Sequence, residues 1–272
     1  MRGRSSRPPK KRSGGSQGRG KNDRSKDRSS HEEFSDRVIV GTHAVNEALK
    51  VRPRSIIKVF LRNDWDASED LVDVHDFCQS KGITIETRKP GFFEAYTSVH
   101  QGVLALSNET PQVNLSRLAE QDTALVVFLD GLTDPHNLGA IMRTAWLLNV
   151  DAIVVPSHRS VAVTPTAVKV ACGGAEHVPV LEVSSLQQEM DDLKQSGFWF
   201  YGLSHRAEKV ISDFEFTGRV GLVIGSEDKG MRTPVERACD ELVRLPQAAA
   251  DASYNASVAT AMALYEVRKQ LT

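Results

Sequence analysis

The chain has 272 residues, a hydrophobic fraction of 40% and a formal net charge of −1. This length is enough for one large or two ordinary domains, and no apolar run approaches the roughly 20 residues that cross a bilayer. The basic N-terminus is followed by no apolar segment, so we expect no secretory signal. The three cysteines are widely spaced and form no CxxC pair, so we expect reduced thiols, a cytoplasmic location and no zinc site.

Charge is divided unevenly along the chain. Residues 1–30 contain 11 Lys or Arg and two acidic residues, a net charge of +9, whereas the remainder has a net charge of −10. A basic segment rich in Gly, Ser and Arg and without aromatics cannot bury a core. We therefore expect residues 1–36 to be a disordered tail, with a polyanion such as RNA as its natural partner. The alternative is a solubilising tail with no specific role.

A small α/β domain is expected over residues 37–107, where strands and helices alternate. Thr42 is expected to be the N-cap of the first helix, and a second helix is expected to end near Gly82. The pattern predicts helices over 43–50 and 67–81, strands over 56–61, 83–87 and 102–106, and a turn at 89–91. Residues 108–123 are polar and are expected to be a linker.

A second domain is expected over residues 124–272. The continuous apolar run at 124–129 is typical of a strand buried on both faces of a parallel sheet. Strict strand–helix alternation predicts such a sheet with helices on both faces. Further strands are predicted over 152–155, 178–180, 199–202, 220–224 and 241–245, and helices over 138–148, 166–171, 186–195, 234–239 and 256–271.

Three polar loops follow buried strands of this domain, at 130–144, 225–231 and 245–259. Ligands collect at the carboxyl ends of parallel strands, so the three loops together indicate a binding site. Each loop alone also has an ordinary interpretation, since Asn137 and Asn255 are common helix caps. No GxGxxG, GxxxxGK[ST], HxxxH or HExxH pattern is present, which argues against ordinary dinucleotide, P-loop and metal sites.

The three loops resemble the three motifs of the SpoU/TrmH methyltransferases, the SPOUT class. The first is Asn137-Leu138-Gly139-Ala140-Ile141-Met142-Arg143-Thr144, and the second is Gly225-Ser226-Glu227-x-x-Gly230-Met231. The third is Leu245-Pro246 followed by Ser253-Tyr254-Asn255-Ala256-Ser257-Val258-Ala259. Residues 41–49 and 100–103 are similar to the small substrate-binding domain of the 23S rRNA guanosine-2'-O-methyltransferase RlmB group. The resemblance covers almost everything except the tail.

This resemblance implies an α/β knot, a homodimer with an active site completed across the interface, and S-adenosylmethionine as cofactor. By matched position it implies cofactor contacts at Gly225, Leu245 and Tyr254. The implied catalytic or substrate-positioning residues are Asn137, Arg143, Glu227, Ser253 and Asn255. The third motif departs from the family pattern: Gln247-Ala248-Ala249 replaces Met-x-Gly, and Tyr254 replaces Leu.

The implied reaction is 2'-O-methylation of an RNA ribose, with a guanosine of 23S rRNA as the expected target. Arg143 is often given the role of base in this family. Neutralising a guanidinium near pH 7 costs roughly 7–9 kcal/mol, so we expect Arg143 to hold a phosphate or to stabilise the developing alkoxide. The alternatives are a tRNA ribose methyltransferase and a non-catalytic RNA-binding or ribosome-assembly protein with the same fold.

Overall fold

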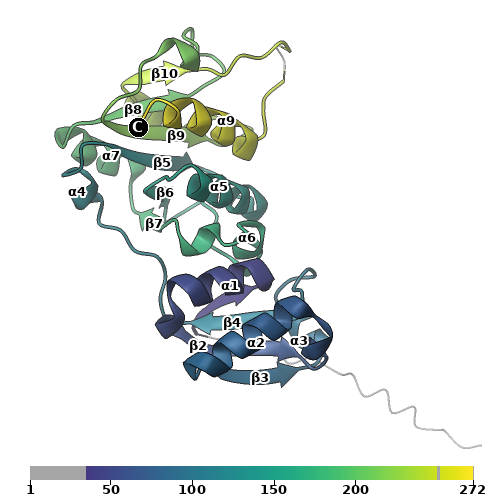
Figure 1. Ribbon diagram of the computed structural model, residues 1–272. Helices are drawn as coiled ribbons and strands as arrows, with labels where there is room; N and C mark the ends of the chain where they lie inside the picture. The colour runs from purple at the N-terminus through teal and green to yellow at the C-terminus, as the bar shows by residue number, and fades with distance from the viewer. Residues whose placement is uncertain (1–34, 250–251, 272) are drawn as a thin grey trace, which may run out of the picture. The chain divides into compact units, whose positions relative to one another are not determined.

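The computed structural model describes residues 35–249 and 252–271. Residues 1–34 lie outside the described residues, and with them nearly all of the expected basic tail. No helix in the described ranges is long and apolar enough to cross a membrane. Two sheets organise the rest, one built from strands β1–β4 and one from strands β5–β10 (Figure 1).

The four-stranded sheet has the order β1-β4-β2-β3, and within it only β2 and β3 are parallel. Leu71 and Val74 of the second helix and Val45 of the first are buried in the core beside this sheet. The elements of this unit are β1 (Arg37–Val40), α1 (Thr42–Val51), β2 (Ile56–Arg62), α2 (Glu69–Lys81), β3 (Thr84–Arg88), α3 (Pro90–Glu94) and β4 (Val103–Ser107).

In this unit one strand was missed and two local predictions were wrong. Strand β1 was not predicted, because its four residues are too few for a clear alternation. Thr42 is the first residue of α1 rather than its cap, and Gly41 occupies the N-cap without a side-chain bond. The expected turn at 89–91 is the start of the short helix α3, since Pro90 is tolerated in a first helical turn.

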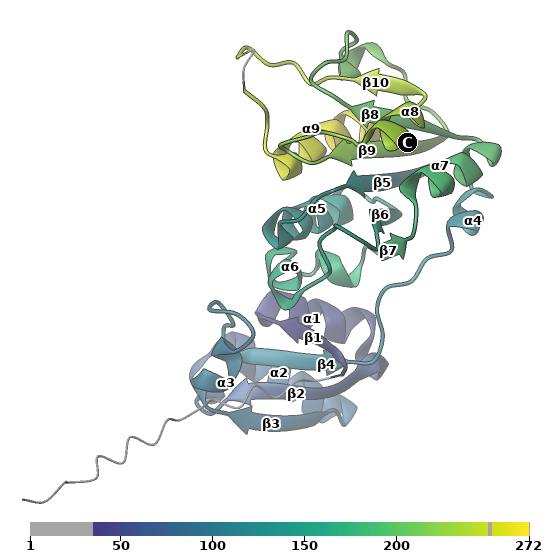
Figure 2. The same ribbon diagram turned by 180° about the vertical axis from the view of Figure 1, so that it is seen from behind.

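The six-stranded sheet is wholly parallel and has the order β10-β8-β9-β5-β6-β7. Side chains of β5 alternate between two cores. Leu125 and Val127 face the core that includes α5, α6 and α9, whereas Val126 and Phe128 face the core that includes α7 and α8. Helices therefore cover both faces, as Figures 1 and 2 show, and the predicted parallel layered sheet is confirmed.

The elements of this unit match the predicted ones closely, with two differences. The interval expected to be a linker contains the short helix α4 (Leu115–Leu118). Strand β7 begins at Val180 rather than Val178, because its pairing with β6 starts only after Pro179. The others are β5 (Ala124–Asp130), α5 (Pro135–Leu147), β6 (Ala152–Pro156), α6 (Pro165–Val170), β7 (Val180–Val183), α7 (Leu186–Gln195), β8 (Phe198–Leu203), β9 (Arg219–Gly225), α8 (Thr233–Arg237), β10 (Glu241–Val243) and α9 (Ala256–Arg268).

A buried carboxylate joins the first unit to the second. The side chain of Glu176 is 0% exposed and accepts two hydrogen bonds from Arg37, at 2.7 and 2.6 Å. Arg52 also pairs with Glu176 and donates to its backbone oxygen at 2.8 Å. Both arginines come from the four-stranded unit. Because a buried carboxylate is tolerated only when it is paired, this contact fixes the junction between the units.

Candidate functional site

Strand order brings the three polar loops to one edge of the six-stranded sheet. Strands β5 and β9 are neighbours, and Asp130 is paired in register with Gly225. The loop after β5 therefore lies beside the loop after β9. The chain continues from β5 toward β6 on one side, whereas it continues from β9 toward β10 on the other. This is the crevice at which open parallel sheets bind ligands.

Asn137 is a buried residue of α5 and not its cap. The carboxylate of Asp134 caps the helix by accepting from the backbone N–H of His136 at 2.9 Å. Asn137 lies in the first turn, is 7% exposed and turns its amide toward the loop after β9. The interpretation of Asn137 as a simple N-cap was therefore wrong, since the capping position belongs to Asp134.

Asn137, Glu227 and Asn255 form a polar cluster, one residue from each predicted motif. Asn137 Nδ2 donates to Glu227 Oε1 at 2.7 Å. Asn255 Nδ2 donates to the same oxygen at 3.0 Å and to Asn137 Oδ1 at 2.9 Å. The backbone N–H of Ala256 also donates to Glu227 Oε1, at 3.1 Å. The structure thus brings together three of the five predicted catalytic residues, and the carboxylate sits at the N-terminus of α9.

Asn255 has two roles, because its side chain also caps α9. Its Oδ1 accepts from the backbone N–H groups of Ser257 and Val258 at 3.0 and 3.4 Å. The capping interpretation of this loop is therefore correct, and it does not compete with a role in the cluster. The amide oxygen holds the helix while the amide nitrogen binds Glu227.

Glycine at position 225 is required by close packing of the loop after β9. A Cβ at this position would lie 2.2 Å from the carbonyl carbon of Gly230 and 2.2 Å from the nitrogen of Met231. The loop closes on itself through two backbone hydrogen bonds between Ser226 and Gly230, at 3.1 and 2.8 Å. Gly230 has a φ of 69°, which a side chain would strain. The second motif is therefore a compact loop whose glycines fix its path.

Asp130 holds this loop from the end of β5. Its carboxylate is 0% exposed and accepts from the backbone N–H and the Nε of Arg232, at 2.6 and 2.7 Å. Sequence reasoning placed Asp130 at the start of the first loop but gave it no partner. The signal was a carboxylate at the end of a wholly apolar strand, which needs a buried partner.

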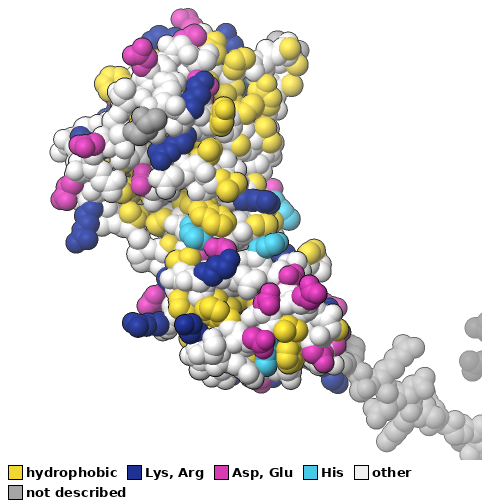
Figure 3. Space-filling model, in the orientation of Figure 1, with side chains coloured by type: hydrophobic (Ala, Val, Ile, Leu, Met, Phe, Trp, Pro, Cys, Tyr) yellow, Lys and Arg dark blue, Asp and Glu magenta, His cyan; other side chains and the backbone are white. Residues whose placement is uncertain are grey.

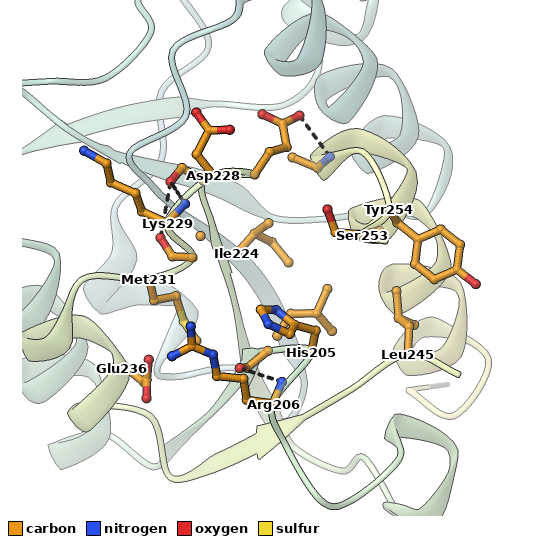
Figure 4. Close-up of a pocket in the computed structure, with 18 of the residues that line it drawn as sticks. His205, Arg206, Ile224, Asp228, Lys229, Met231, Glu236, Leu245, Ser253 and Tyr254 are labelled. Atoms are coloured by element: carbon orange, nitrogen blue, oxygen red, sulfur yellow. Dashed lines mark hydrogen bonds between the residues drawn. The ribbon is translucent and has the colours of Figure 1, made fainter. Parts of the chain in front are cut away.

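A cavity of about 370 Å³ opens beside the cluster (Figure 4). Ile224 and Leu245 give it an apolar part, and charged groups of both signs stand around them. This mixture fits S-adenosylmethionine, which combines an adenine ring with a sulfonium and an amino-acid tail. Its lining includes the predicted cofactor residues Gly225, Leu245 and Tyr254, the predicted catalytic residues Ser253 and Glu227, and the additional residues Leu203, Ser204, His205, Arg206 and Glu236.

The additional residues His205 and Arg206 were missed by sequence reasoning. They follow β8, whose carboxyl end lies at the same edge of the sheet as the ends of β9 and β10. The loop after β8 carries none of the matched motifs. Its position after a parallel strand was the signal that could have identified it.

The third loop stabilises itself where it departs from the family pattern. Gln247 Nε2 donates to the backbone oxygens of Ala249 and Ala252, both at 3.1 Å. Tyr254 Oη donates to the backbone oxygen of Pro246 at 2.8 Å, and its ring lies at the rim of the pocket (Figure 4). Ala249 is not among the described residues with a positive φ, so this position of the backbone does not require a glycine. These substitutions are therefore compatible with an open pocket.

Arg143 stands apart from the polar cluster. It lies six residues after Asn137 on α5, which is about 9 Å along the helix and about 120° around it. Its Nη1 donates to Cys172 Sγ at 3.6 Å. Within one chain, therefore, the described residues do not bring Arg143 to the carboxylate of Glu227. In the described ranges no group of three or more His, Cys, Asp or Glu side chains is placed to hold a metal ion.

Two protein-family models match this chain. The model described as "SpoU rRNA Methylase family" matches residues 124–265, and the one described as "RNA 2'-O ribose methyltransferase substrate binding" matches residues 38–112. The chain belongs to the SpoU rRNA methylase family. The 23S rRNA (guanosine-2'-O-)-methyltransferase RlmB of Vibrio parahaemolyticus is 37% identical over 244 residues, which cover 87% of this chain and 98% of that protein. RlmB of Escherichia coli K12 is 35% identical over 243 residues, covering 86% and 98%.

Solved structures of SpoU methyltransferases share this fold. AviRb from Streptomyces viridochromogenes, in complex with AdoMet, has a TM-score of 0.74 and 23% identity, and covers 86% of this chain and 90% of its own. An AdoMet-bound rRNA methyltransferase from Sinorhizobium meliloti has a TM-score of 0.71 and 20% identity, covering 85% and 86%. The expected SpoU fold class, the α/β knot, is confirmed by this likeness.

Proposed function

We propose that this SpoU protein transfers the methyl group of S-adenosylmethionine to the ribose 2'-oxygen of a guanosine in 23S rRNA. The observation that carries the proposal is the cluster of Asn137, Glu227 and Asn255 at the edge of the cofactor-sized cavity. The names of relatives at 35–37% identity support the choice of 23S rRNA and guanosine. A tRNA ribose is the alternative target within the same chemistry.

Bound S-adenosylmethionine supplies a methyl group already activated on a sulfonium. The protein has to align the ribose hydroxyl with that group, and alignment alone is worth several kcal/mol. Gly225, Leu245 and Tyr254 line the cavity and would hold the cofactor. The Glu227 oxygen that accepts three hydrogen bonds is held in place by them, which leaves Oε2 to orient a substrate hydroxyl or its proton.

Arg143 would serve the active site of a second copy of the chain. Leu147 follows it by four residues on the same face of α5 and is 71% exposed. On α9, Val258 and Tyr265 are 48% and 63% exposed and lie seven residues apart, on one face. Figure 3 shows hydrophobic side chains gathered over α5 and α9. This apolar face suits a homodimer in which Arg143 of one protomer reaches the cluster of its partner.

Mixing two inactive variants tests the shared site. Asn137→Ala and Arg143→Ala should each be inactive as homodimers, because each removes one half of every site. After the two are unfolded together and refolded, a mixed dimer has one intact site, so about a quarter of the wild-type activity should return. No recovery, or a monomer in analytical ultracentrifugation, would contradict the shared site. Leu147→Glu should weaken the dimer, while Trp199→Glu, at an exposed position on β8, should leave it intact.

Mapping of ribose methylation tests the function itself. Total RNA from cells with and without the gene is compared for 2'-O-methyl sites. Loss of one guanosine mark in 23S rRNA supports the proposal, whereas loss of a mark in tRNA supports the alternative. Loss of no mark, together with no S-adenosylmethionine binding in calorimetry, would favour a non-catalytic RNA-binding protein. A cytoplasmic location accords with the three free cysteines and with a ribosomal RNA substrate.

A further inference from the structure

The side chain of Lys169, a residue of α6, lies against the N-terminal end of helix α1, where a cation is electrostatically disfavoured. A Cβ placed on Gly41, the N-cap of α1, would lie 2.5 Å from Lys169 Nζ. The first turn of this ten-residue helix contains no acidic residue, and Gly41 offers no side-chain cap. The N-terminus of a helix carries a partial positive charge, which attracts anions and repels ammonium groups. The Lys169 ammonium therefore lies beside the partial positive charge of the α1 N-terminus, which is an unfavourable arrangement.

Lys169 has no carboxylate partner within the described part of the chain. Its ammonium donates to the side-chain oxygen of Gln101, a neutral group that also accepts from the backbone N–H of Thr42 at 3.3 Å. Burial lowers the pKa of Lys169, and Cys172 raises it by a smaller amount. Lys169 and Arg62 both lie near enough to His100 to lower its pKa, and Glu94 is the acid that acts on the same imidazole. The charge at the helix end is thus left without an anion.

Two further observations single out the same place. Thr42, in the first turn of α1, is 3% exposed, and its hydroxyl oxygen has no hydrogen-bond partner among the described residues. Gln101 and Cys172, which flank Lys169, have φ values of 54° and 48°. Only four described residues other than glycine have a positive φ, and strain of this kind is kept mainly at functional positions.

We infer that Lys169, Gln101 and the N-terminus of α1 form a binding site for a phosphodiester of the substrate RNA. A helix N-terminus beside an amide and an ammonium that lacks a carboxylate partner is a suitable anion site. The site faces the same junction as the proposed catalytic arginine, because Arg143 contacts Cys172, whose thiol in turn lies 3.7 Å from the Lys169 backbone oxygen. The inference rests on the proposed function in one respect, that the polyanion is RNA.

The site would position the RNA strand and take no part in methyl transfer. It joins α1 of the four-stranded unit to α6 of the six-stranded unit, which lie side by side in Figures 1 and 2. A phosphate held here therefore has a fixed distance from the cofactor pocket. Its loss should raise the Michaelis constant for RNA and leave turnover at saturating RNA nearly unchanged.

Salt-dependent RNA binding by the full-length chain provides the test. The probe is an in vitro transcribed fragment of 23S rRNA that the wild-type protein methylates or, failing methylation, binds. Lys169→Ala should weaken binding about tenfold near 0.1 M salt and reduce the log–log salt slope by about 0.7–0.9, the loss of one phosphate contact. Lys169→Arg should restore most of the affinity. Lys209→Ala removes an exposed lysine that is ion-paired with Glu241, and serves as the matched control.

Thermal unfolding without RNA separates this role from a structural one. If Lys169 serves to bind an anion, its charge is unfavourable in the RNA-free protein. The Lys169→Ala variant should then unfold at the wild-type temperature or above it. A lower unfolding temperature together with an unchanged salt slope would overturn the inference, as would a wild-type chain that binds no RNA. The binding assay contains no S-adenosylmethionine, so a lysine-dependent slope in a protein that methylates nothing would refute the proposed function alone.

Discussion

Replacement of Gly225 by alanine should abolish cofactor binding by displacing the loop after β9. The added Cβ would stand 2.2 Å from two backbone atoms of Gly230 and Met231, whereas ordinary contact begins near 3.4 Å. The loop must therefore withdraw by about 1.2 Å, the difference between these distances. Backbone cannot rotate away as a flexible side chain can, so we expect a loss of stability of about 2–3 kcal/mol.

The displaced loop carries Glu227, so the effect should reach the polar cluster. A misplacement of about 1 Å near reacting groups can cost a factor of about 100 in rate. Calorimetric titration with S-adenosylmethionine and a methylation assay measure the two effects. Gly91→Ala is the matched control, since a Cβ there meets nothing within 4 Å. If Gly225→Ala binds the cofactor like the wild-type protein, the argument from close packing is refuted.

Further substitutions test the contacts that support the site. Glu176→Gln should lower the free energy of unfolding by about 3 kcal/mol, because two arginines then face a neutral amide in a buried position; an unchanged denaturation midpoint would contradict this. Asp130→Asn should cost about 2 kcal/mol and weaken cofactor binding, which calorimetry with the purified variant measures. Burial raises the pKa of Cys239 to about 12, so at pH 8 about one thiol in 10,000 is ionised. Cys172 and Cys239 are both partly exposed, but the protonated Cys239 thiol should be alkylated slowly. Peptide mass spectrometry of the native protein should therefore find Cys172 modified first.

The sheet of the second unit could be predicted from sequence because its strands are continuous apolar runs. The residues 124–129 cannot alternate between water and core, so only a strand covered on both faces accommodates them. Short elements were harder. Strand β1 has four residues, and α3 begins at a proline followed by a glycine, a pair that is more common in turns.

The polar cluster could not be derived from local pattern. Asn137 and Glu227 are separated by 90 residues, and the sequence of either loop does not indicate which residue the Asn137 amide will contact. The same limit applies to Gly225, whose need for glycine comes from close packing and not from an unusual φ. Family resemblance named these residues as one set, and the structure brings Asn137, Glu227 and Asn255 into contact within one chain. Arg143 lies on another face of α5.

The bond from Asn255 to Asn137 spans 118 residues and therefore has a consequence for synthesis of the protein. At a translation rate of about 5–20 residues per second, Asn137 leaves the peptidyl transferase centre about 6–24 seconds before Asn255. Until β9 (Arg219–Gly225) has been made, which takes up most of this interval, β5 also has one unpaired edge. The nascent chain is thus prone to aggregation until β9 covers this edge, and it lacks a complete polar cluster until the start of α9 has emerged. Chaperones should therefore matter most while the segment between β5 and β9 is being made.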